Sequence, residues 1–168
     1  MIYCARELQW HGYAEASRRA IERAINWYTS RPDSEQQIES RRVALAAAYY
    51  VGERFADARR IYAKLLKKDP QNINDQGYLG TIAARMGDTA EARQIDRILK
   101  SINRPYVFGN HTYWRARIAS LLGEKEQAVA LLRSALSQGV SYGRLHADVD
   151  LEPLREYPPF QELVKPQD

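Results

Sequence analysis

The chain has 168 residues, of which 45% are apolar and 27% are charged, and this is enough apolar material for the core of one ordinary domain rather than a disordered segment. Its single cysteine, Cys4, excludes an internal disulfide and a cysteine-based zinc cluster. Lysine and arginine number 25 against 21 acidic residues, so the net charge of +4 permits an acidic partner without indicating nucleic acid. The longest apolar run, residues 43–51, is too short to cross a membrane, which takes about 20 residues.

Residues 1–140 are predicted to form four helix pairs. Apolar residues recur at steps of three and four, as on one face of a helix, and no stretch alternates as a strand would. Each pair is expected to turn near a glycine, which accepts the left-handed backbone at no steric cost. In chain order these glycines are Gly12, Gly52, Gly87 and Gly123. The third turn is best marked, because Asp88 with Glu91 three residues later forms the pattern of a helix N-cap with a capping box.

The four pairs form an internal repeat. A small residue near the start of each second helix recurs at separations of 41, 34 and 36 residues. These small residues are Ser17, Ala58, Ala92 and Ala128. A period near 34 with this pattern resembles the tetratricopeptide repeat, in which each unit is a pair of antiparallel helices. The best copy carries Leu45, Ala46, Tyr49, Phe55, Ala58, Tyr62, Leu65 and Pro70.

The resemblance implies an all-α fold, a right-handed superhelix of about four antiparallel helix pairs over residues 1–140. Residues 141–168 are expected to form a C-terminal capping segment within the same single structural domain. Stacked helix pairs expose apolar faces at both ends of the stack, so terminal caps are needed. The side chains expected to cover the last pair are Leu151, Leu154, Phe160 and Leu163. Met1 is expected to begin inside the first helix, which favours either truncation from a longer chain or a homodimer through the N-terminal edge.

Residues 104–114 and 146–163 are similar to the C-terminal repeat tail of large bacterial signalling proteins, where such a tail follows a Ser/Thr kinase or a winged-helix DNA-binding domain. This resemblance implies that the chain is the sensor or scaffold part of a larger protein. We expect a cytoplasmic location without direct membrane insertion, or an extracytoplasmic one if the parent protein spans a membrane.

No arrangement of residues predicts catalysis, so we expect a protein that is not an enzyme and has neither cofactor nor metal. Cys4 is expected to be a small core residue. Four alternating polar residues could in principle hold a hard cation, although Asp150 is more simply the N-cap of a short helix. These four are His146, Asp148, Asp150 and Glu152. Basic pairs recur along the chain, most of them on second helices, and are interpreted as a solvated face rather than as a nucleic-acid site. They include Arg18–Arg19, Arg41–Arg42, Arg59–Arg60 and Lys67–Lys68.

The first helix of each pair is expected to line a concave groove, an inference from the resemblance. Its stripe contains aromatic residues and arginines, the types that dominate binding hot spots, and no acidic residue. The predicted groove residues are Tyr3, Arg6, Trp10, Tyr50, Tyr78, Arg85, Tyr113, Trp114 and Arg117. We therefore expect a scaffold that binds an acidic, partly hydrophobic segment of a partner protein. A small-molecule or enzymatic groove and a structural dimerisation arm are the alternatives.

Overall fold

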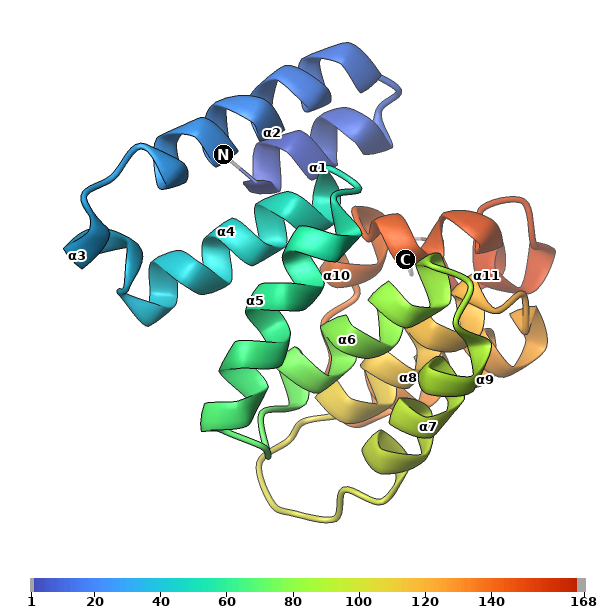
Figure 1. Cartoon of the computed structure of the whole chain (residues 1–168). Coiled ribbons are helices and arrows are strands. Elements are labelled where there is room, and N and C mark those ends of the chain that lie inside the picture. The colour runs from blue at the N-terminus through green and yellow to red at the C-terminus, as the bar shows by residue number, and fades with distance from the viewer. Residues whose placement is uncertain (1, 166–168) are drawn as a thin grey trace. The chain divides into compact units, whose positions relative to one another are not determined.

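The computed structural model describes residues 2–165, and every regular element in that range is a helix (Figure 1). The predicted all-α class is therefore confirmed for these residues. The chain divides into two compact units, Met1–Asp69 (unit 1) and Pro70–Asp168 (unit 2), and each is described by itself. Met1, which the sequence analysis placed inside the first helix, lies outside the described residues.

Unit 1 consists of two helix pairs joined by a short helix. Its elements are α1 (Ile2–Trp10), α2 (Ala14–Thr29), α3 (Asp33–Gln36), α4 (Glu39–Val51) and α5 (Phe55–Lys68). The hydroxyl of Ser17 on α2 donates to the carbonyl of Ala5 on α1 at 2.8 Å, so the small residue that marks the repeat joins the two helices. Ile21, Ile25 and Ala48 join Ala5 in the core that α2 shares with α4. The segment containing α3 occupies the additional length that makes the first repeat separation 41 residues rather than 34.

The turns within the helix pairs share one backbone geometry, with a left-handed residue just beyond the first helix. Gly12, Gly87 and Gly123 adopt this conformation, with φ between 78° and 82°. The second turn differs, because Glu53 takes the left-handed position at φ 58° while Gly52 has φ −82°. The prediction that Gly52 supplies the left-handed residue is therefore wrong by one position. Asp88 caps α7 as predicted, and its carboxylate accepts from the backbone N–H of Glu91 at 3.0 Å.

Unit 2 also contains two helix pairs, followed by a C-terminal segment. Its elements are α6 (Ile73–Arg85), α7 (Thr89–Lys100), α8 (Asn110–Leu121), α9 (Lys125–Ser137), α10 (Gly143–His146), a 3-10 helix η1 (Val149–Leu154) and α11 (Pro158–Val164). α6 packs closely on α8, because Gly77 leaves room for the ring of Trp114. A Cβ atom at Gly77 would lie 2.0 Å from that ring, so a side chain there would fit only if the ring or a helix moved.

The C-terminal segment completes the core of unit 2. Leu151 and Leu154 of η1 and Phe160 and Leu163 of α11 are all buried, in the same cluster as Leu132 and other residues of α8 and α9. The prediction that these four side chains cover the last helix pair is confirmed. As a result, η1 lies against α8, and its acidic residues are carried to the surface formed by α6 and α8.

Candidate functional site

Five of the nine predicted groove residues lie together in unit 2, on the surface of α6 and α8 that η1 covers; we call this surface the inner face of unit 2. Arg117 on α8 is 4% exposed, and its guanidinium donates to Asp150 Oδ2 at 2.9 and 2.5 Å and lies 3.3 Å from Asp148 Oδ2. Arg85 on α6 donates to the other carboxylate oxygen of Asp150 at 2.9 and 2.8 Å. One fully buried carboxylate therefore joins two helices through two arginines.

The helices α6 and α8 also hold the main chain of the segment that carries these carboxylates. We call residues 148–154 the acidic segment. Arg85 donates to the carbonyl oxygen of Val149 at 2.9 Å, and the hydroxyl of Ser120 donates to the carbonyl oxygen of Asp150 at 2.7 Å. Side chains of α6 and α8 thus bind both the acidic groups and the backbone, as a protein binds a peptide.

The expectation that Arg85 and Arg117 face no acidic residue is wrong, because the acidic segment neutralises both. Asp148 and Asp150 lie 31 or more residues from these arginines in sequence, so the helical stripe alone gave no sign of them. The role expected of Asp150 also changes. Asp148 is the N-cap of η1, and its Oδ1 accepts from the N–H of Asp150 at 3.0 Å.

Aromatic side chains surround this ion-pair network. Tyr78 and Trp114 meet edge to face with ring centroids 4.6 Å apart, and the Arg117 guanidinium lies 3.8 Å from the Trp114 centroid. The indole N–H of Trp114 donates to Asn74 Oδ1 at 3.1 Å. Trp114 and Arg117 therefore belong to the buried structure of unit 2 rather than to an exposed binding stripe.

Tyr113 connects the network to the helix α10. Its hydroxyl lies 2.5 Å from Asp148 Oδ2 and 3.0 Å from the carbonyl oxygen of Arg144. Burial, together with the nearby carboxylate of Asp148, raises the pKa of Tyr113 well above the usual tyrosine value. The phenol is therefore held neutral and acts as a hydrogen-bond donor at physiological pH.

Replacing Tyr113 with Phe should lower the free energy of unfolding by about 1.5–3 kcal/mol near neutral pH, because Asp148 loses a buried donor. A raised pKa in the folded state stabilises the protein below the unfolded-state pKa of about 10, and this contribution is lost as the pH rises further. The stability of the wild type should therefore fall more steeply above about pH 10 than that of the variant. Urea unfolding across pH tests this, with the exposed Tyr3→Phe as the matched control. Parallel pH profiles would contradict the assignment.

The other four predicted groove residues lie in unit 1, on the helices α1 and α4. Tyr3 is 81% exposed on α1, whereas Arg6 and Trp10 on the same helix are partly buried. Tyr50 on α4 is buried and meets the ring of Phe55 edge to face at 5.8 Å. Cys4 is exposed, so its expected core position is wrong. Cys4 comes one position before Ala5, the buried residue of α1, and a step of one residue along a helix rotates the side chain by about 100°.

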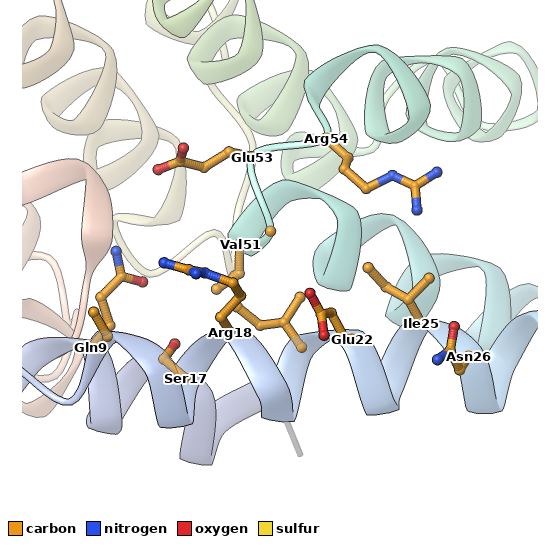
Figure 2. A pocket seen from close by; sticks show the side chains of 12 residues that line it. Gln9, Ser17, Arg18, Glu22, Ile25, Asn26, Val51, Glu53 and Arg54 are labelled. Carbon is orange, nitrogen blue, oxygen red and sulfur yellow. The ribbon is translucent and has the colours of Figure 1, made fainter.

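Unit 1 carries two pockets that the sequence analysis did not identify. The first, of about 580 Å³, lies between α2 and the turn from α4 to α5 (Figure 2). Ile21, Ile25 and Val51 supply its apolar surface. Its charged side chains are of both signs, and they are Arg18, Glu22, Glu53 and Arg54. Figure 2 shows the α2 side chains on the side of that helix that faces Val51, the last residue of α4.

The second pocket, of about 510 Å³, is formed by the end of α2, by α3 and by facing sides of α4 and α5. It has one acidic residue, Asp57, against four basic ones. The basic side chains are Arg41, Arg42, Arg60 and Lys64. The sequence analysis interpreted these arginines as a solvated face. The helical spacings of Arg42, Leu45 and Tyr49 on α4 and of Arg60 and Lys64 on α5 are the signals that could have placed them together.

The two pockets are neighbours along α2 and α4. The first uses residues 14–26 of α2 and the C-terminal end of α4, and the second uses residues 28 and 29 of α2 and earlier residues of α4. Arg54 of the first pocket donates to Asp57 of the second at 2.9 and 2.6 Å, and its guanidinium lies 4.5 Å from the ring of Tyr49. These three side chains mark the boundary between the pockets.

Within residues 2–165, no three side chains of the metal-ligating types gather closely enough to hold a metal ion. The acidic residues that sequence spacing had suggested as cation ligands, Asp148 and Asp150, bind arginines instead. In the same part of the chain, no helix combines the length and apolar character needed to cross a bilayer.

The chain matches no protein-family model, no curated protein and no solved structure. Its function is therefore argued from its own residues.

Proposed function

We propose that the chain is a protein-interaction module, built from helix pairs of the tetratricopeptide type, that binds an acidic, partly apolar segment of a partner protein. The observation that carries this proposal is the acidic segment on unit 2. There, two helix pairs hold a stretch of the chain through arginine–carboxylate pairs, bonds to its carbonyl oxygens and burial of its leucines. This is the chemistry by which helical scaffolds recognise a peptide.

A partner segment would bind to unit 1. The inner face of unit 2 already holds the acidic segment, and a tethered segment has an effective concentration of about a millimolar or more, so a partner at micromolar concentration competes poorly. Unit 1 instead offers two neighbouring pockets with apolar surfaces and charged side chains. Their succession along α2 and α4 suits an extended segment better than a compact small molecule, which favours a binding module over the enzymatic alternative.

The proposal includes the larger context that the sequence suggests. A module of this kind would serve as the sensor or scaffold part of a bacterial signalling protein, and its catalytic chemistry would lie elsewhere. The right-handed superhelical stacking of the four pairs belongs to the same proposal, which is supported by their shared turn geometry at Gly12, Glu53, Gly87 and Gly123.

Selection of a random peptide library on the immobilised full-length chain tests the proposed function. We expect the enriched peptides to combine aspartate or glutamate with large apolar residues, and their binding to weaken as salt rises, because surface charge interactions are screened. A bare support and a library of scrambled versions of the enriched peptides are the controls. Recovery of no sequence above these controls would contradict a peptide-binding function.

A further inference from the structure

Arg42 and Lys64 stand out among the charged groups of unit 1. Of the four basic side chains in the second pocket, Arg41 pairs with Glu35 and Arg60 pairs with Asp57. Arg42 and Lys64 form no ion pair with any residue in the range 2–165, although both line the pocket. The pocket therefore carries two positive charges that the described part of the chain leaves uncompensated.

From this charge we infer that the second pocket of unit 1 binds the carboxylates of an acidic peptide segment, with Arg42 and Lys64 as the residues that receive them. The inference rests on the proposed function and assigns its site. Arginine and lysine both form charge-assisted hydrogen bonds with carboxylates. The two residues lie on different helices, α4 and α5, so acidic groups bound between them would be held from two sides.

The remaining surface of the pocket indicates a segment that is partly apolar. Leu45 and Ile61 line it together with the rings of Tyr28 and Tyr49. An aliphatic or aromatic side chain next to the acidic residue would remove this surface from water, which stabilises the complex by about 25 cal/mol for each Å² of apolar area buried. The occupant therefore combines acidic and apolar residues, as the acidic segment of unit 2 does.

The neighbouring pocket favours a peptide over a nucleic acid. Glu22 and Glu53 line the first pocket, which continues the same surface along α2. A phosphate backbone carries a negative charge at every nucleotide, so its continuation would meet these carboxylates. A peptide can place acidic residues in the second pocket and apolar or basic residues in the first.

The test uses the full-length chain and a fluorescein-labelled synthetic peptide with the sequence of residues 146–154, whose acidic and apolar composition matches the inferred occupant. Binding is followed by fluorescence anisotropy. We expect binding to wild type that weakens at least about tenfold in Arg42→Glu/Lys64→Glu, since removal of charged hot-spot contacts has effects of this size. The variant Arg23→Glu/Lys67→Glu is the matched control, because it makes the same change of charge on exposed positions of α2 and α5 outside both pockets.

A helical circular dichroism spectrum and a melting curve like that of wild type confirm that each variant is folded. If Arg42→Glu/Lys64→Glu is unfolded, the milder Arg42→Gln/Lys64→Gln replaces it. Equal weakening in both charge-reversal variants, or no peptide binding below about 1 mM, would overturn the pocket assignment. Tighter binding of a fluorescent single-stranded oligonucleotide through Arg42 and Lys64 would overturn the choice of a peptide. Library-selected peptides that bind the pocket variant as well as wild type would leave the proposed function standing and remove only this site.

Discussion

Replacing Asp150 with Ala should lower the free energy of unfolding by about 3–5 kcal/mol, the usual effect of removing one partner from a buried ion pair. The carboxylate of Asp150 is fully buried and receives four hydrogen bonds from Arg85 and Arg117. Its loss removes two hydrogen bonds from the buried guanidinium of Arg117, which still lies 3.3 Å from Asp148 Oδ2. Urea unfolding followed by circular dichroism measures the change.

The control for this substitution is Glu152→Gln, which removes a carboxylate from the same 3-10 helix at an exposed position. Its effect should stay within about 0.5 kcal/mol. Adding Arg117→Met to Asp150→Ala should restore part of the loss, because the buried guanidinium that has lost its Asp150 partner is then removed as well. If the three variants were equally stable, the ion-pair network would not contribute to the stability of unit 2.

Truncation after Val149 should abolish cooperative folding of unit 2. The deleted residues include Leu151, Leu154, Phe160 and Leu163, which are buried against α8 and α9. Burying a side chain of this size contributes about 1.5–3 kcal/mol, so the loss is comparable with the total stability of a domain, which is about 5–15 kcal/mol. We expect aggregation in size-exclusion chromatography and a clear fall in melting temperature, since the apolar face of the last pair becomes exposed.

A point substitution gives a milder version of the same test. Phe160→Ala should cost about 3–5 kcal/mol, whereas Gln161→Ala at the exposed neighbouring position should change stability little. An unchanged melting curve for the truncated chain would show that residues 150–168 contribute nothing to the fold of unit 2.

Local signals in the sequence were sufficient to predict the helix pairs and their turns. Asp88 and Gly87 specify a cap and a left-handed residue within a few positions, and the structure has both. The C-terminal capping segment was also predictable, because Leu151 and Phe160 are apolar side chains that must pack against another surface to leave water, and the last helix pair has an exposed apolar face. The error at Gly52 shows the limit of such signals, since a non-glycine residue, Glu53, adopts the left-handed backbone there.

The candidate sites depend on contacts that no local pattern records. Arg85 and Asp150 are 65 residues apart in sequence, and nothing in the stripe around Arg85 indicates that an acidic segment will cover it. From the composition of the stripe we predicted an acidic, partly apolar segment of a partner protein, and this stays a prediction, whereas the segment that lies on Arg85 and Arg117 in the structure belongs to the chain itself. The pocket of Arg42 and Lys64 was missed because its residues come from several helices, and helical periodicity describes one helix at a time.

The long separation between the two halves of the ion-pair network also has a consequence during synthesis. A chain grows at about 5–20 residues per second, and Asp150 follows Arg117 by 33 residues. The carboxylate of Asp150 is therefore synthesised about 2–7 s after the arginine that it binds. During that interval α6 and α7 are already synthesised, and α8 and α9 are completed, before the side chains that complete the core of unit 2 are available. Unit 2 is therefore expected to close late, in a step that begins only when its final segment has left the ribosome.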